Sequence, residues 1–81
     1  MGEIFRQGPF SVIIYPNDHP RPHVHVVRDG TVVVFTLGND DVPPAVWKVR
    51  RMKPPDVVRA FRIVERNQAE FLDRWREIHG A

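Results

Sequence analysis

The sequence contains no cysteine. It can therefore form neither a disulfide bond nor a thiolate metal site, and any bound metal would have histidine and carboxylate ligands. A chain without cysteine is compatible with a reducing cytoplasm, where we expect this protein to reside. No apolar run approaches the roughly 20 residues of a membrane-spanning helix, so we expect no membrane partner. The N-terminal residues also lack the basic start and apolar stretch that are typical of a signal peptide.

Length and charge set further bounds on the function. A chain of 81 residues is long enough for one hydrophobic core, so we expect a single domain over residues 1–81. Apolar residues make up 42% and charged residues 27%, an ordinary globular balance that gives no support to a disordered or fibrous class. The formal net charge of +2 is too small to indicate nucleic-acid binding, which has to be argued from local clusters of charge.

Short runs of β-branched and aromatic residues, separated by turn residues, predict four strands. They are Phe10–Tyr15, His23–Arg28, Thr31–Leu37 and Pro44–Arg51. The dipeptide Asp29-Gly30 between the second and third runs favours a two-residue type I′ hairpin turn, because both positions of that turn need positive φ. We expect Trp47 to anchor the last strand.

After Pro54-Pro55 the apolar residues follow a helical period instead. The polar pair Asn67-Gln68 interrupts the apolar stripe, so either one helix kinks there or two helices meet with Asn67 as a cap, and we expect two. Gly80 suits the end of a helix, with His79 facing solvent. The predicted fold is a two-layer α+β domain. It is a four-stranded antiparallel meander with the C-terminal helix or helix pair packed on one face.

The hairpin turn fixes which residues share a face of the predicted sheet. If Asp29-Gly30 is the turn, His25 opposes Val34 and Val24 opposes Phe35. One face then carries Val24, Val26, Val33 and Phe35, and we expect it to pack against the helices. The other carries His23, His25, Val27, Val32, Val34 and Thr36. Nothing in so short a chain remains to cover this second face, so we expect an exposed apolar patch that meets a partner, another copy or a ligand.

Three of the four histidines lie within seven residues of the sequence: His19, His23 and His25. His23 and His25 are two apart on a strand, so both imidazoles point the same way and could hold one zinc or manganese ion. Asp18 or His19 could supply a third ligand. Without a metal, the two imidazoles could act as general acid and base in phosphodiester cleavage. The alternative is structural: the loop residues bond backbone in a proline-stiffened loop, and the strand histidines pack at an interface.

Two groups of basic residues could contact nucleic acid. They are Lys48, Arg50, Arg51 and Lys53, followed by Arg59, Arg62 and Arg66 on the first helical segment. Lysine and arginine also protect edge strands from pairing, and helix arginines are usually a solvated face. Alternation along the strand would turn Trp47 away from Lys48, which disfavours stacking of a single strand on this aromatic ring.

The stretch Asn17–Val26 reads N-D-H-P-R-P-H-V-H-V. It resembles the motif N-D-H-x-P-P-H-x-H-V of a family of small bacterial and archaeal proteins known only as a domain of unknown function. The resemblance extends over nearly the whole chain. Arg21 replaces the family's usual proline and adds a positive charge among the histidines, which disfavours a bound cation.

The resemblance implies a site but no activity. The matching positions are Asp18, His19, His23 and His25, and members of the family often look like one half of a two-gene pair similar to a toxin–antitoxin module. We therefore expect an interaction module that uses the histidine-bearing sheet face to bind a small partner protein or a second copy. The alternative is a small histidine-dependent hydrolase, most plausibly a nuclease, with or without a divalent metal.

Overall fold

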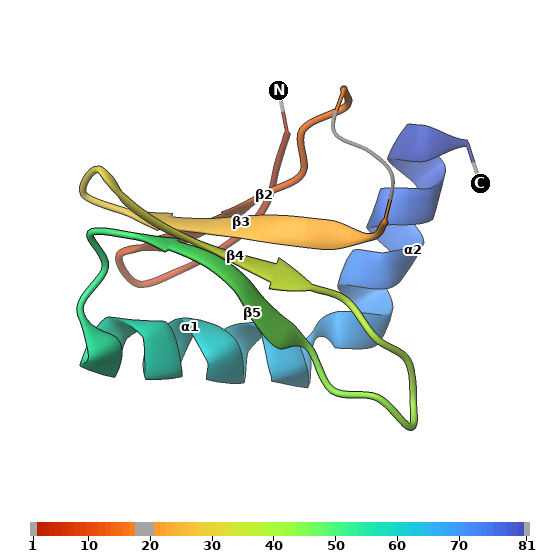
Figure 1. Cartoon of the computed structure of the whole chain (residues 1–81). Helices are drawn as coiled ribbons and strands as arrows, with labels where there is room; N and C mark the ends of the chain where they lie inside the picture. Colours follow the sequence, from red (N-terminus) through yellow and green to blue (C-terminus); the bar gives the residue numbers. More distant parts are fainter. Residues whose placement is uncertain (1, 18–20, 81) are drawn as a thin grey trace.

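A computed structural model describes residues 2–17 and 21–80 of the chain. Within them, five strands form one antiparallel sheet in the order β1-β2-β3-β4-β5, followed by two helices (Figure 1). The elements are β1 Glu3–Gln7, β2 Phe10–Ile13, β3 His23–Arg28, β4 Thr31–Thr36, β5 Ala45–Arg50, α1 Pro54–Arg66 and α2 Gln68–His79. The α+β class and the meander are confirmed, whereas the predicted number of strands was one too low.

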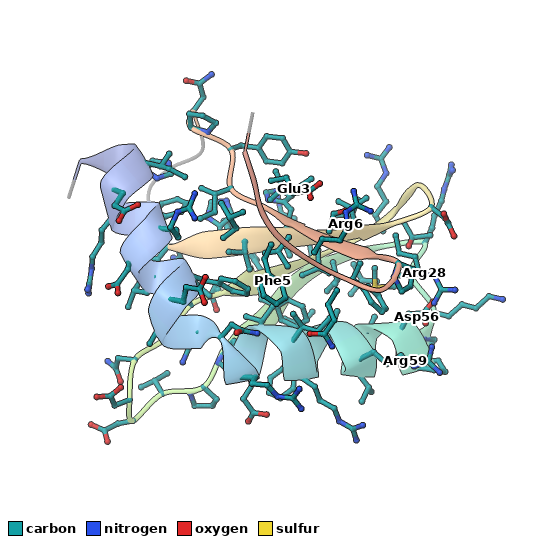
Figure 2. The ribbon with its side chains drawn as sticks, turned by 180° about the vertical axis from the view of Figure 1, so that it is seen from behind. Glu3, Phe5, Arg6, Arg28, Asp56 and Arg59 are labelled. Atoms are coloured by element: carbon teal, nitrogen blue, oxygen red, sulfur yellow. The ribbon has the colours of Figure 1, made fainter. Side chains whose placement is uncertain are left out.

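The strand missed from the sequence is β1, which pairs with β2 at one edge of the sheet. Its register shifts between Glu3 and Phe5, so the consecutive residues Ile4 and Phe5 both pack against the core. The ring of Phe5, which is labelled in Figure 2, meets Phe71 of α2 edge-on, with 5.4 Å between centroids. Because this irregularity removes the alternation of apolar and polar residues, the sequence carried no period-two signal here.

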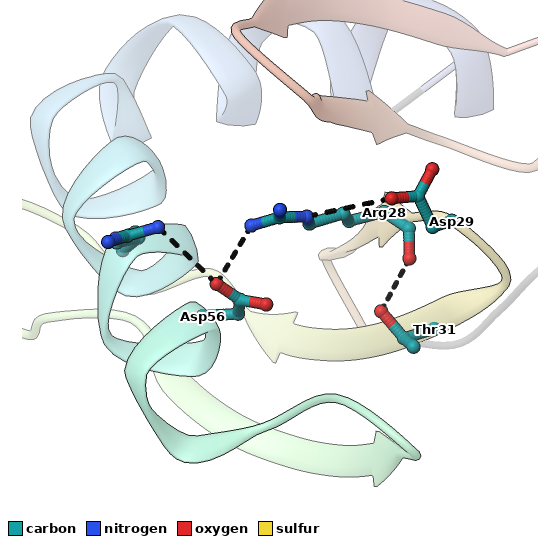
Figure 3. A network of polar contacts seen from close by, with 5 residues as sticks. Arg28, Asp29, Thr31 and Asp56 are labelled. Atoms are coloured by element: carbon teal, nitrogen blue, oxygen red, sulfur yellow. Dashed lines mark hydrogen bonds and ion pairs between the residues drawn. The ribbon is translucent and has the colours of Figure 1, made fainter.

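The β3–β4 hairpin has the register that the sequence predicted, with His25 opposite Val34 and Val24 opposite Phe35. Asp29 and Gly30 have φ angles of 46° and 78°, as a type I′ turn requires. The hydroxyl of Thr31 donates to the Arg28 carbonyl at 2.6 Å across this turn (Figure 3). This hairpin is the frame that holds His23 and His25.

The core lies between one face of the sheet and the two helices, with Phe71 and Trp75 as the contribution of α2 (Figure 1). That face carries the predicted set Val24, Val26, Val33 and Phe35, all fully buried. Phe61 of α1 packs on Phe35 at 6.0 Å between ring centroids. The prediction that this side of the hairpin packs against a helix is therefore confirmed.

The prediction of two helices is also confirmed, with Asn67 between them. Its side-chain amide donates backward to the Ile63 carbonyl at 2.8 Å, so the side chain caps the end of α1 rather than the start of α2. At the far end of α2, Gly80 takes the left-handed conformation with φ 69°. Neither helix described is long and apolar enough to cross a membrane.

Gln68, the polar residue in the apolar stripe, fastens the β4–β5 loop to the start of α2. Its carbonyl oxygen accepts from the Gly38 backbone N–H at 2.7 Å. Its amide donates to the carbonyls of Asn39 and Val42 at 3.3 and 3.1 Å. A hydrophobic side chain here would leave these backbone groups without this partner, which explains the interruption.

Beyond Asn67 the chain changes direction, and α2 passes the end of the sheet where β3 begins (Figure 1). This path brings Trp75 of α2 to His23, with 4.9 Å between the two rings. The expectation that no part of the chain covers the histidine-bearing face was therefore wrong at this end. The sequence pattern gave the length of α2 but not the angle at which it leaves α1.

Candidate functional site

His23 is buried at the start of β3, with 4% of its surface exposed. Its Nδ1 lies 2.7 Å from the backbone carbonyl of Arg21. Because a carbonyl oxygen can only accept, Nδ1 carries the hydrogen and donates, and in the neutral ring Nε2 holds the lone pair. This bond fixes both the tautomer and the ring orientation of His23.

Aromatic rings from two other elements enclose His23. Trp75 of α2 lies 4.9 Å away in a tilted arrangement, and Trp47 of β5 lies 5.2 Å away edge-on. The ring of His25 is 5.4 Å from that of His23. His79 in turn stacks on Trp75 at 3.6 Å with an interplanar angle of 22°. The prediction that His79 faces solvent was wrong, because its ring lies over Trp75 and is partly buried.

His25 extends this arrangement toward the surface. It is half-buried, and Tyr15 packs edge-on against it at 4.7 Å. Tyr15 and Trp47 are each 43% exposed. We call the six side chains Tyr15, His23, His25, Trp47, Trp75 and His79 the ring cluster. It is buried at Trp75 and opens to solvent at Tyr15 and Trp47.

The ring cluster depends on a β-bulge in β5. Val34 pairs with Lys48 but Phe35 pairs with Val46, so Trp47 is an extra residue on its strand. A bulge of this kind places neighbouring side chains on one side of the sheet. Lys48 Nζ accordingly lies over the Trp47 ring at 5.1 Å. The prediction that Trp47 turns away from Lys48 was therefore wrong.

The valines beside the histidines do not form the exposed patch that the sequence predicted. Val27 and Val32 are half-buried, and Val34, flanked by His25 and Lys48, is only 6% exposed. The exposed large apolar residues lie elsewhere, with three on β5: Tyr15, Val42, Val46, Trp47, Val49 and Val58. The apolar surface is therefore at the β5 edge rather than on the hairpin.

The described residues supply part of the predicted metal site. Within residues 2–17 and 21–80, no group of three or more histidine, cysteine or carboxylate side chains is placed to hold a metal. His23 and His25 do lie together, as predicted. The other two predicted ligands, Asp18 and His19, fall outside the described residues. The zinc or manganese site remains a prediction that rests on this histidine pair.

The basic residues separate into two groups at opposite edges of the sheet. Lys48, Arg50, Arg51 and Lys53 are exposed on and after β5. Arg59, Arg62 and Arg66 of α1 instead line a groove with the β1–β2 turn. Since β1 and β5 are the two edge strands, these are two basic surfaces rather than one. Nucleic-acid contact by either group stays a prediction.

Trp75 belongs to the hydrophobic core, as its place in the apolar helical stripe indicates, but the sequence did not predict its contacts with the histidines or any role for Tyr15. One usable signal was present, because Trp75 and His79 are four residues apart on a helix and must share a side. The contacts of Tyr15 and Trp47 depend on the end of β2 and on the bulge. Neither feature has a sequence signature in this chain.

A groove of about 700 Å³ lies away from the ring cluster. It runs between the β4–β5 loop and the junction of α1 with α2, and none of the six ring-cluster residues lines it. Its acidic lining residues are Asp40, Asp41, Glu65 and Asp73.

One protein family matches most of this chain, including the histidine pair that α2 covers. Residues 10–76 match the family described as Domain of unknown function (DUF4160), and the chain belongs to it. The match spans His23, His25 and both tryptophans, whereas β1 and His79 lie outside it. No curated protein and no solved structure matches the chain.

Proposed function

We propose that this protein is an interaction module that binds a small partner protein through the outer face of its sheet, as one half of a pair of the toxin–antitoxin type. The observation that carries the proposal is the exposure of Tyr15 and Trp47, each 43%, at the two ends of a line of rings through His25 and His23. Tyrosine and tryptophan carry much of the binding energy in protein interfaces.

The ring cluster is also held in place before any partner arrives. His23 is fixed by its bond to the Arg21 carbonyl and by Trp75 behind it, which is 3% exposed. The exposed rings pack against these fixed ones. Side chains that are ordered in the free protein lose little entropy on binding, so more of the contact energy remains as affinity.

Charge favours a partner of different sequence over a second copy. Lys48, Arg50, Arg51 and Lys53 are exposed at the β5 edge beside Trp47. Two copies that met at this edge would bring like charges together, which costs free energy. A partner with acidic residues around an apolar centre would complement both the charges and the rings.

The test is complex formation with the product of the neighbouring gene, measured by calorimetry on the purified proteins. Trp47→Ala should weaken the complex roughly 30-fold or more, as expected for an interface residue worth about 2 kcal/mol. Val58→Ala is the matched control, because Val58 is 48% exposed but lies on α1 on the opposite side of the sheet. Equal affinity of the Trp47→Ala and Val58→Ala proteins would refute the proposal.

A second candidate is a histidine-dependent hydrolase, favoured by the bond between His23 Nδ1 and the Arg21 carbonyl. A carbonyl partner of this type orients catalytic and metal-binding imidazoles. The 4% exposure of His23 counts against direct contact with a substrate. Cleavage of RNA or DNA that is lost in His25→Ala would support this candidate. A zinc and manganese titration followed through the histidine ring resonances would test for the metal.

A further inference from the structure

Three arginines of α1 line a groove on the opposite side of the molecule from the ring cluster. Arg59, Arg62 and Arg66 form one wall, and the β1–β2 turn, from Gln7 to Phe10, forms the other. The groove has a volume of about 290 Å³. The arginine positions i, i+3 and i+7 place all three side chains on one side of the helix.

Two of these arginines carry uncompensated charge. Arg59 lies 3.6 Å from a carboxylate oxygen of Asp56. Among the residues that the structure describes, no carboxylate pairs with Arg62 or Arg66. Four other arginines do have such a partner, at distances of 3.2, 3.0, 3.4 and 3.9 Å for Arg6, Arg28, Arg74 and Arg76. The groove therefore contains two guanidinium groups that no described ion pair holds, of which Arg66 also lines the neighbouring groove beside Glu65.

The rest of the groove is apolar and open. Phe10 and Ile63, each 4% exposed, contribute to its lining. Gly8 turns the chain with φ 57°, as the first central residue of a two-residue turn, and the space above its Cα is empty within 4 Å. A ligand in the groove would thus meet no side chain at Gly8 itself.

We propose that this groove binds the phosphate groups of a nucleotide or of single-stranded nucleic acid. A phosphate monoester carries a charge of roughly −1.5 to −2 at pH 7, which matches Arg62 and Arg66 together, whereas one carboxylate matches only one of them. Guanidinium groups bind phosphate oxygens through two parallel hydrogen bonds. Arg59 and Arg66 are separated by ~10 Å along the helix axis, enough to serve adjacent phosphates of a backbone.

The experiment measures binding of AMP, of an eight-nucleotide single-stranded RNA and of an octaglutamate peptide to the intact protein, with amide resonances of the β1–β2 turn as the readout. The test variant is Arg62→Gln with Arg66→Gln. The matched control is Arg74→Gln with Arg76→Gln, which removes the same charge from α2, where both arginines pair with carboxylates and neither lines the groove. Thermal melting of both variants verifies that they remain folded.

We expect the groove variant to bind AMP or RNA at least about tenfold more weakly, and the control to bind within about twofold of the original chain. If RNA is the ligand, the logarithm of its association constant should fall with the logarithm of the salt concentration, with a slope of roughly −2 to −3 for three phosphate contacts. In the groove variant this slope should be less than half as steep. AMP binding without tighter RNA binding would identify a free nucleotide as the source of the phosphate.

Two results would overturn the proposal. One is that the phosphate probes fail to bind, or bind both variants equally, which would make the interaction a non-specific charge effect. The other is that only octaglutamate binds in a manner dependent on Arg62 and Arg66, which would assign the groove to an acidic protein segment. Neither result bears on the outer sheet face, because Trp47 does not line this groove.

Discussion

The two ends of β3 join the sheet to a helix in different ways. At the C-terminal end, Arg28 donates to Asp56 of α1 at 3.0 Å, and Arg59 approaches the same carboxylate oxygen at 3.6 Å (Figure 3). At the N-terminal end, His23 lies against Trp75 of α2. One helix is thus joined to β3 by charge and the other by a contact between aromatic rings.

The contacts at these two ends differ in their exposure to water. The side chains of Arg28 and Asp56 are 31% and 20% exposed, so solvent and salt screen their attraction. Trp75 is 3% exposed and makes its contacts through area removed from water. The ring end continues to the exposed Tyr15 and Trp47, whereas the ionic end continues to Arg59, which lines the groove with the β1–β2 turn. We infer that the Arg28–Asp56 pair is structural and that the ring end combines structure with a binding surface.

Replacement of Trp75 by alanine tests the structural part of the ring end and should have the largest effect. It removes a buried ring that contacts both His23 and His79, so the free energy of unfolding should fall by about 3–5 kcal/mol. Domains of this kind have a total stability of roughly 5–15 kcal/mol, so the variant should be close to unfolding. Urea denaturation followed by circular dichroism measures the change.

Trp75→Phe is the control for this variant, because it keeps an aromatic ring in the same place. It should lose clearly less stability than the alanine variant. A loss of less than about 1 kcal/mol for Trp75→Ala would mean that α2 is not held to the sheet by this ring.

The sequence predicted those parts of the fold that depend on neighbours along the chain. The Asp29-Gly30 turn set the register of the hairpin, and with it the buried face of β3 and β4, because side chains alternate in a strand. Asn67 and Gly80 marked helix ends through their own backbone preferences. The same alternation predicted that His23 and His25 lie side by side on one face of β3.

The parts that the sequence did not predict depend on long-range geometry. The bulge at Trp47 and the shift beside Ile4 each break the alternation on which strand prediction relies. The position of α2 depends on the bend at Asn67 and on the three hydrogen bonds of Gln68 to the β4–β5 loop. These bonds join residues about thirty positions apart, which no local pattern reveals.

Replacement of Asp56 by asparagine tests the ionic end and should have an intermediate effect. The change removes the charge that Arg28 and Arg59 share, and the acidic residue in the first turn of α1. We expect a loss of about 1–2 kcal/mol in the free energy of unfolding. The difference between the original chain and the variant should shrink in 1 M NaCl, because salt screens partly exposed charges.

Glu3→Gln is the matched control, since it removes one carboxylate from the exposed pair of Glu3 with Arg6 at 3.2 Å (Figure 2). It should change stability by less than about 0.5 kcal/mol. An Asp56→Asn effect that is equally small, or one that does not respond to salt, would contradict the ionic account of this end of β3.

His23→Phe separates the hydrogen bond at the ring end from its packing. The phenyl ring keeps the contacts with Trp47 and Trp75 but cannot donate to the Arg21 carbonyl. We expect a loss of about 1 kcal/mol, the usual net value of one hydrogen bond, measured by urea denaturation. A gain in stability would show that His23 is kept for function at a cost in stability, which would favour the hydrolase over the interaction module.

Tyr15→Ala should have the smallest effect on stability and separates the binding surface from the scaffold. Tyr15 is 43% exposed and touches the cluster through the edge-on contact with His25, so the loss should stay below about 1 kcal/mol. Its complex with the neighbouring gene product should nevertheless weaken about tenfold or more. Tyr15→Phe, which keeps the ring, should retain most of that affinity. The opposite result would be that Tyr15→Ala lowers stability as much as Trp75→Ala and leaves the affinity unchanged. The ring cluster would then be structural throughout, and the two ends of β3 would differ in the type of contact but not in their role.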